Sequence, residues 1–255
     1  MKIEEIELAL ASNPLPLIED PKDERDFEYV DDSKDLPEVF SRRSEMTPVK
    51  DQGKRGTCTA FTVAGLAEWI EKKKTGKDID LSEQFLFDVT KVLDELDRFY
   101  SHGSTIRTAM KALQKKGICE EKFFKYEPKA RQDIYKTQVP SREAFKDAAK
   151  RKIEKYRSVV RVVTEIEKAV YNVGPLPGGV RLYRDFRHSR KTGILPPPKT
   201  SKDKFINHGI LVVGYDRKRK LIEVKNSWGE DYGDEGYSWI PYDYFPNHVL
   251  SFWTL

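Results

Sequence analysis

The 255-residue sequence has only two cysteines, Cys58 and Cys119, and its 15 glycines and 14 prolines follow no repeat. These counts exclude a disulfide-bonded scaffold and a collagen-like or low-complexity chain. No stretch approaches the roughly 20 consecutive apolar residues that a membrane-spanning helix requires, and the N-terminus is acidic where a secretory signal would be basic. We therefore expect a globular, cytoplasmic protein with a sizeable core and no membrane partner.

The net charge is only +4, but it is distributed unevenly along the chain. The first 35 residues carry 12 acidic and 4 basic side chains, so this segment has a net charge of −8 and the remainder has +12. In the remainder, lysine and arginine alternate with acidic residues, as in RKIEKYR from Arg151. Such alternation is typical of a solvated helix face, and we expect no nucleic-acid partner.

Metal-binding patterns are also missing. Neither cysteine belongs to a CxxC pair, and no histidine or cysteine cluster has the spacing of zinc ligands. We therefore expect no metal site. Cys119 follows a predicted helix end in an apolar context, which favours a structural role for it.

Hydrophobic spacing predicts helices in the first half of the chain. Apolar residues recur at helical spacing from Cys58 to Thr75, where the segment has become basic, and Gly76 follows as a stop signal. A second helix should begin after Ser82, whose side chain can cap it. A third, within 104–117, should end at Gly117.

The second half has a different pattern. β-branched and aromatic runs bounded by Gly, Pro and Asp predict a mostly antiparallel sheet, with 196–198 (three prolines) in an irregular loop. Helices followed by strands favour an α+β fold with two lobes. The predicted strands are VVRVV (159–163), GGVRLY (178–183), HGILVVGYD (208–216), LIEVKNSW (221–228) and GYSWIPY (236–242).

One cysteine lies where a nucleophile could be activated. Cys58 opens the first predicted helix, and unpaired amides and the dipole at a helix start favour a thiolate. A nucleophile also needs a base, and His208 is the one histidine followed by a strong strand; the others are His102, His188 and His248. Asn226 ends an apolar run about one strand later and could orient the imidazole. Cys58 and His208 each also allow a purely structural interpretation.

Five segments together resemble the papain-like cysteine peptidases. In DQGKRGTCTAF (51–61), a glutamine precedes the cysteine by six positions, as it does in that family. The matching segments occur in family order from Leu36 to Tyr237. The other four are DLPEVFSRRSEMTPVKDQG, LSEQFLF, NHGILVVGYD and KNSWGEDYGDEGY.

The resemblance implies a fold and a role for each matching residue. It implies a helical lobe packed against an antiparallel, β-barrel-like lobe, with the active site in the cleft between them. Cys58 would be the nucleophile, a thiolate paired with protonated His208, and Asn226 would orient His208. The Gln52 side chain and the Cys58 backbone amide would form the oxyanion hole. Trp228 would cover the contact between His208 and Asn226, and no cofactor is implied.

Two further residues are expected to bind substrate. Gly103 corresponds to a glycine that binds substrate backbone, and Asn207 helps to line the pocket for the second side chain on the acyl side of the scissile bond. Three positions depart from the family pattern. Arg55 stands where a disulfide-forming cysteine is usual, which is consistent with a reducing compartment. Thr59 and Tyr232 replace aromatic residues of the cleft wall.

We expect an acidic N-terminal arm at 1–35 and a papain-like peptidase domain at 36–255. The helical lobe should cover about 47–150, and the sheet lobe about 151–255 together with an N-terminal strand. The arm, with its net charge of −8, should pack on the basic body, either as an autoinhibitory segment or as a structural wrap.

The predicted function is hydrolysis of peptide bonds by a cysteine peptidase. An endopeptidase acting as a monomer on peptide or protein substrates is the leading hypothesis. An exopeptidase on the same scaffold remains open, although no His-bearing insertion that would block the cleft is evident. A thiol acyltransferase and a non-catalytic binding module on the same fold are the alternatives.

Overall fold

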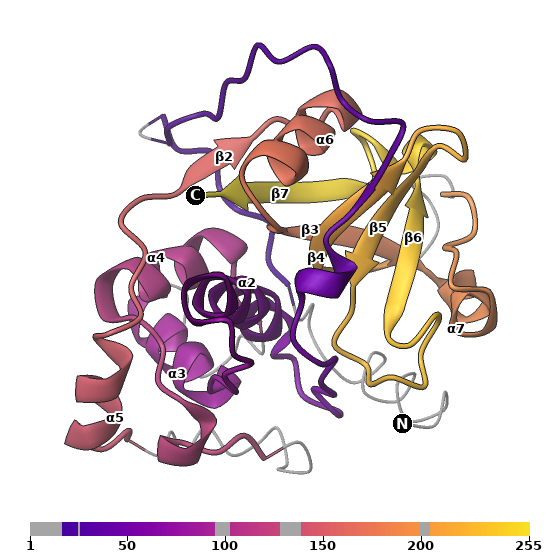
Figure 1. Cartoon of the computed structure of the whole chain (residues 1–255). Helices are drawn as coiled ribbons and strands as arrows, with labels where there is room; N and C mark the ends of the chain where they lie inside the picture. The colour runs from indigo at the N-terminus through magenta and orange to yellow at the C-terminus, as the bar shows by residue number, and fades with distance from the viewer. Residues whose placement is uncertain (1–16, 25, 95–102, 128–138, 199–204) are drawn as a thin grey trace.

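The computed structural model describes residues 17–24, 26–94, 103–127, 139–198 and 205–255. The helices from the first half of the chain gather on one side of the molecule and an antiparallel sheet lies on the other, with α2 between them (Figure 1). The α+β expectation is therefore confirmed, although the sheet is open and not closed into a barrel.

Helix α2 (Cys58–Thr75) is buried on almost every side along its first twelve residues. This agrees with its nearly continuous apolar sequence, which has no polar face to turn to solvent. Its end lies as predicted, because Gly76 takes a left-handed φ of 70°. The Ser82 side chain caps α3 by accepting from the Phe85 N–H. Around α2 pack α3 (Glu83–Leu93), α4 (Ile106–Lys116) and, farther out, α5 (Arg142–Ala148).

In the part of the chain that the structure describes, the sheet contains seven strands, and every paired neighbour is antiparallel. Its order is β2-β7-β3-β4-β5-β6, and β1 pairs with the end of β4 that β3 leaves free. The strands are β1 (Val39–Ser41), β2 (Arg157–Val159), β3 (Leu176–Tyr183), β4 (Phe205–Asp216), β5 (Leu221–Lys225), β6 (Tyr237–Pro241) and β7 (Val249–Thr254).

Strand β4 is covered on both faces, so its apolar run is nearly continuous. Leu211 and Val213 belong to the core shared with the helices, whereas Ile210 and Val212 belong to a second core on the opposite face. The helix α6 (Val163–Asn172) covers that second face. The strand that carries His208 is therefore fixed from both sides.

Helix α6 is the main departure from the sequence prediction. The run VVRVV (159–163) was expected to be one strand, but β2 ends at Val159 and α6 begins at Val163. Ile166 and Val170 recur four residues apart and are fully buried, so the helical spacing determines the structure here. The second half also includes the short helix α7 (Ser189–Thr192).

The described part of the N-terminal arm lies along the body. Glu28 forms a parallel bridge to Ser158 in β2, and the arm then passes α6, where Lys168 donates to the Asp31 carbonyl (Figure 1). Residues 1–16 of the predicted arm, which include a short apolar run at 6–10, lie outside the described residues.

Candidate active site

Cys58 is the first residue of α2 and is completely buried, with 0% of its surface exposed. The Cys119 side chain is also buried, and the two are free thiols. Strand β4 approaches the start of α2 closely, because a Cβ on Gly209 would lie 3.1 Å from the Cys58 carbonyl. The absence of a side chain at Gly209 thus brings the strand that carries His208 next to Cys58.

His208 is held by two neighbours from the segment after β5. Its Nε2 lies 2.9 Å from Oδ1 of Asn226, and its ring stacks on Trp228 with centroids 4.2 Å apart. Tyr232 packs edge-on against Trp228 at 4.7 Å. Tyr232 therefore takes part in the aromatic support of the imidazole although it replaces a tryptophan of the family pattern.

Burial shifts the pKa values of both Cys58 and His208. It raises the pKa of the Cys58 thiol to about 11, against the effect of backbone hydrogen bonds from Gly209 and Thr59. It lowers the pKa of His208 to about 4, and the hydrogen bond to Asn226 opposes that shift. With both side chains buried, the structure therefore favours a neutral thiol and a neutral imidazole, in contrast to the thiolate and imidazolium that the resemblance implies.

The amide of Gln52 has a fixed orientation. Its Nε2 donates to the Arg55 carbonyl at 2.7 Å, and its Oε1 accepts from the Ser227 hydroxyl at 2.6 Å. Because a primary amide carries two N–H groups, Nε2 keeps a second donor for a ligand. Ser227 directly follows Asn226, so one short segment supports both the imidazole and the amide.

The turn that leads to Cys58 is held by a cation and an aromatic ring. The Arg55 guanidinium donates to Oε1 of Gln84 at 2.5 Å and lies 4.8 Å from the ring centre of Tyr126. The Tyr126 hydroxyl donates to the Gln52 carbonyl at 2.8 Å. These contacts tie the turn to α3 at the position where the family pattern has a cysteine.

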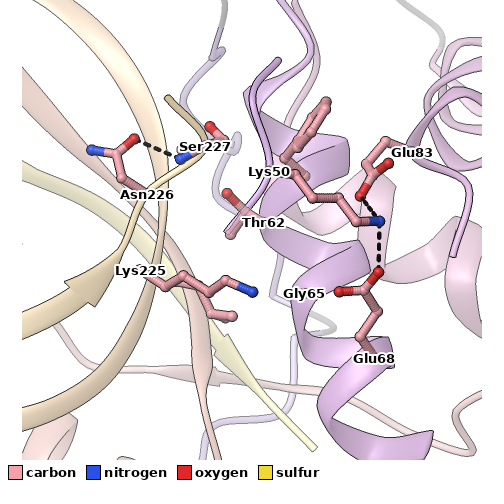
Figure 2. A pocket seen from close by; sticks show the side chains of 11 residues that line it. Lys50, Thr62, Gly65, Glu68, Glu83, Lys225, Asn226 and Ser227 are labelled. Carbon is pink, nitrogen blue, oxygen red and sulfur yellow. Dashed lines mark hydrogen bonds and ion pairs between the residues drawn. The ribbon is translucent and has the colours of Figure 1, made fainter. Parts of the chain in front are cut away.

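A buried ionic cluster lies behind the site (Figure 2). The Lys50 ammonium sits between the carboxylates of Glu68 and Glu83, at 2.7 and 2.8 Å. From the sheet side, Lys225 donates to the Thr47 carbonyl at 2.8 Å, and burial lowers its pKa to about 8. Lys50 lies two residues before Gln52, and Lys225 lies one residue before Asn226. The cluster therefore anchors the two segments that carry Gln52 and Asn226.

Both predicted substrate-binding residues lie beside the arm. The carbonyl of Gly103 accepts from Lys91 at 2.8 Å, and the next residue, Ser104, forms a parallel bridge with Leu17. Asn207 donates from Nδ2 to the Leu17 carbonyl at 3.1 Å. The structure thus brings these residues together around a segment of the chain itself.

Sequence reasoning missed Ser227, Gly209 and Leu17. Ser227 and Gly209 each adjoin a residue that was selected, and their position next to Asn226 and His208 was the available signal. Leu17 gave none, because it lies in a polar, Pro-containing segment far from the other residues.

Among the described residues, no group of three or more His, Cys, Asp or Glu side chains has an arrangement that could hold a metal ion. Within the same ranges, no helix is both long and apolar enough to span a bilayer.

Comparison with known proteins places this geometry in context. Residues 36–247 match the family described as papain family cysteine protease. The chain is 28% identical over 241 residues to an uncharacterized peptidase C1-like protein of Acanthamoeba polyphaga mimivirus, covering 89% of this chain and 75% of the relative. It is 31% identical over 203 residues to cathepsin K of Mus musculus, covering 78% of this chain and 57% of the relative.

Solved structures of cysteine proteases are also similar to this chain. Xylellain, a cysteine protease from Xylella fastidiosa, superposes with a TM-score of 0.81 at 27% identity, covering 93% of this chain and 94% of that chain. The digestive procathepsin L 3 of Tenebrio molitor has a TM-score of 0.70 at 23% identity, with 89% and 72% covered, and this likeness concerns the fold alone.

Proposed function

The chain belongs to the papain family of cysteine proteases, and we propose that Cys58, His208 and Asn226 are its catalytic residues. Family membership implies peptide or protein substrates. One observation carries the assignment of residues. Asn226 engages Nε2 of His208 at 2.9 Å, while Gly209, the next residue after His208, lies so close to Cys58 that a Cβ there would be 3.1 Å from the Cys58 carbonyl. Nδ1 of His208 is then the nitrogen that can exchange a proton with the thiol.

Catalysis begins with transfer of the thiol proton from Cys58 to His208. Burial disfavours either charge alone, but the two charges form together and attract each other, and the start of α2 stabilises the thiolate. The sulfur then attacks the peptide carbonyl carbon. The carbonyl oxygen becomes an oxyanion, which accepts hydrogen bonds from the second N–H of Gln52 and from the Cys58 backbone amide.

The reaction then proceeds through an acyl-enzyme. The C–N bond breaks as His208 protonates the leaving amine, and a thioester on Cys58 remains. Water attacks the thioester carbonyl while His208 accepts a water proton. The C–S bond breaks, the acid product leaves, and the proton returns to the sulfur. Asn226 and Trp228 hold the imidazole in one orientation throughout.

We also propose that the arm restrains the enzyme. Cys58 is fully buried, so a substrate reaches it only after the covering segments move. Leu17 lies against Asn207, the neighbour of His208, and Asp20 anchors the arm by accepting from Trp253 Nε1 at 2.7 Å and from the Arg107 N–H at 3.1 Å. Replacing Asp20 by alanine should loosen the arm and raise peptidase activity. Val30→Ala, at an exposed arm position, is the matched control.

The mode of cleavage proposed is endopeptidase, since the sequence offers no evident His-bearing insertion that would block one end of the cleft. Peptides capped at both ends, with a fluorophore and a quencher flanking an internal bond, provide the test. We expect cleavage by the wild-type chain and by Cys119→Ala, and none by Cys58→Ala. Cleavage of free-ended peptides without cleavage of the capped peptides would instead indicate an exopeptidase.

The same assay separates the alternative functions. A thiol acyltransferase would attach an added primary amine to the peptide and give little hydrolysis, which mass spectrometry of the products distinguishes. A non-catalytic module would give neither product with any peptide. Asn226 favours hydrolysis over transglutaminase-like transfer, where the third residue is typically an aspartate.

A further inference from the structure

The two donors proposed for the oxyanion hole stand at opposite ends of one short turn. Gln52 begins the turn and contributes its side-chain amide, and Cys58 ends it and contributes its backbone N–H. Two of the five residues between them are glycines, Gly53 and Gly56, and Gly53 has a left-handed φ of 61°. A backbone that contains glycine has many accessible conformations. Contacts that join the two ends therefore decide how far apart the donors lie.

The Tyr126 hydroxyl joins the two ends of this turn. It donates to the Gln52 carbonyl at 2.8 Å, and it lies 2.6 Å from the Thr57 hydroxyl. Because a phenol has one proton and a carbonyl oxygen can only accept, the Thr57 hydroxyl must be the donor to Tyr126. Burial raises the pKa of Tyr126, so the phenol keeps the proton that it donates.

The ring of Tyr126 is held by contacts with two helices. The Arg55 guanidinium lies 4.8 Å from the ring centre and donates to Oε1 of Gln84 in α3 at 2.5 Å. Phe61 of α2 packs edge-on against the ring, with centroids 4.9 Å apart. Arg55 also orients the Gln52 amide, because its carbonyl accepts from Nε2 at 2.7 Å. The hydroxyl that joins the ends of the turn is therefore attached to α2 and α3.

We propose that Tyr126 is a positioning residue for the oxyanion hole, and that its hydroxyl sets the distance between the Gln52 side chain and the Cys58 N–H. This inference rests on the proposed peptidase function. The hydroxyl acts through the carbonyl of one donor residue and through Thr57, which precedes the other, and not by contact with the substrate. Both donors must reach the same oxygen as its charge develops. A misplacement of about 1 Å can cost roughly 10²-fold in rate.

The first test separates turnover from binding. Tyr126→Phe keeps the ring and removes the hydroxyl, so kcat for a capped peptide should fall about 10- to 100-fold while KM changes by less than about twofold. Tyr244→Phe is the matched control, because Tyr244 is also buried and its hydroxyl also donates to a backbone carbonyl, that of Pro196, at 2.9 Å. This control should keep both constants of the wild type. An equal loss of kcat in the two variants, or a loss that appears in KM alone, would overturn the inference.

A second measurement tests the oxyanion hole itself. The carbonyl carbon of a blocked peptide aldehyde bonds to the Cys58 sulfur, and the thiol proton passes to the carbonyl oxygen, which then lies where the oxyanion forms. The affinity of Tyr126→Phe for the aldehyde should fall by the same factor as kcat/KM, since both depend on the two donors. The corresponding peptide alcohol forms no such bond, and its affinity should stay the same. Equal losses for the aldehyde and the alcohol would contradict a role in the oxyanion hole.

Thr57→Val is a second variant, which leaves the Tyr126 side chain complete. Thr57 precedes α2, but its side chain makes no capping hydrogen bond with the helix, so the substitution removes the bond to Tyr126. We expect kcat to fall in this variant, and the double substitution to lose no more than Tyr126→Phe alone, because the two hydroxyls act as one unit. Losses that multiply would contradict the linked arrangement. If Tyr126→Phe does not fold, an unchanged kcat in Thr57→Val overturns the inference.

Hydrogen exchange separates this inference from the proposed function. The backbone N–H of Gln52 donates to the Ser227 carbonyl at 2.9 Å. Its exchange should be roughly tenfold faster in Tyr126→Phe than in the wild type, the effect of losing one hydrogen bond. If the intact chain cuts no peptide but this exchange accelerates, the peptidase assignment fails and the contact of Tyr126 with the turn stands. If Tyr126→Phe cuts peptides as fast as the wild type, the peptidase assignment stands and the positioning role is wrong.

Discussion

The Ser227 hydroxyl donates to Oε1 of Gln52 at 2.6 Å, and the Gln52 backbone N–H donates to the Ser227 carbonyl at 2.9 Å. These two bonds lock a residue of the N-terminal segment to the segment that follows β5. They also determine which end of the Gln52 amide is the donor, since Nε2 bonds to the Arg55 carbonyl. In the proposed mechanism, Ser227 is therefore a positioning residue for the oxyanion hole.

Removal of the Ser227 hydroxyl should weaken that positioning. Loss of an oxyanion donor itself costs roughly 10²–10³ in kcat, and we expect Ser227→Ala to cost about tenfold because the Gln52 amide remains present. KM should change little, since the effect arises in the transition state. Steady-state kinetics with a capped peptide measures both constants. Ser41→Ala, at an exposed serine, is the control. If Ser227 had only a structural role, Ser227→Ala would lower the thermal midpoint and leave kcat unchanged.

The hydrogen bond between Asn226 and His208 predicts a shift in the pH profile. Asn226→Asp would place a carboxylate 2.9 Å from the imidazole, and a negative charge stabilises imidazolium and raises its pKa. The limb of the kcat/KM profile that reports His208 should therefore move to higher pH. Asn247→Asp, at an exposed asparagine, should leave the profile unchanged. A profile of Asn226→Asp identical to that of the wild type would show that this asparagine does not act on His208.

The buried His208 and Cys58 predict a loss of stability at both ends of the pH range. The pKa of His208 is lowered to about 4 from 6.5, so the unfolded chain binds a proton first as pH falls from about 6.5 to 4, and the free energy of unfolding decreases there. The pKa of Cys58 is raised from 9.0 to about 11, so the unfolded thiol ionises first as pH rises through that window, and stability again decreases.

Denaturant melts across the pH range measure this effect. His208→Gln should reduce the loss between pH 6.5 and 4, and Cys58→Ala should reduce the loss between pH 9 and 11. Parallel curves for the variants and the wild type would contradict the assigned protonation states.

The ionic cluster predicts a large effect of a small substitution. Glu68 binds Lys50 at 2.7 Å and the Leu81 N–H at 3.1 Å while almost completely buried. When Glu68 is neutralised, Lys50 keeps the carboxylates of Glu83 at 2.8 Å and Asp80 at 2.5 Å, so the loss is that of hydrogen bonds to a charged group, about 1.5–3 kcal/mol. Glu68→Gln should lower the free energy of unfolding by an amount in this range. Glu143→Gln, on the exposed side of α5, should leave it nearly unchanged. Similar values for the two variants would mean that the cluster does not stabilise the fold.

Much of the fold could be predicted because local signals agreed with the final packing. Gly76 ends α2 and Ser82 caps α3 where the sequence predicts, since these positions depend on the conformation of one turn. The run from Val159 to Val163 was misassigned because valine suits both a strand and the buried face of a helix. Only the packing of α6 on the sheet distinguishes the two.

Part of the candidate site could likewise be predicted from the sequence, and part could not. Cys58, His208 and Asn226 lie within recognisable segments, and the hydrogen bond from His208 to Asn226 is in place. Their assignment as catalytic residues stays a prediction. The role of Ser227 and the position of Leu17 depend on contacts between residues far apart in the chain, such as those of Gln52 with Ser227 and of Leu17 with Asn207. No local pattern in the sequence encodes such contacts.

The most direct test of the account is covalent labelling with an epoxysuccinyl peptide, followed by intact-mass measurement. The account predicts one adduct on the wild-type chain and on Cys119→Ala, none on Cys58→Ala, and faster labelling of Asp20→Ala than of Val30→Ala. Labelling that persists in Cys58→Ala, or a wild-type chain and an Asp20→Ala variant that both remain unlabelled, would contradict the assignment of Cys58 as an activated nucleophile beneath a restraining arm.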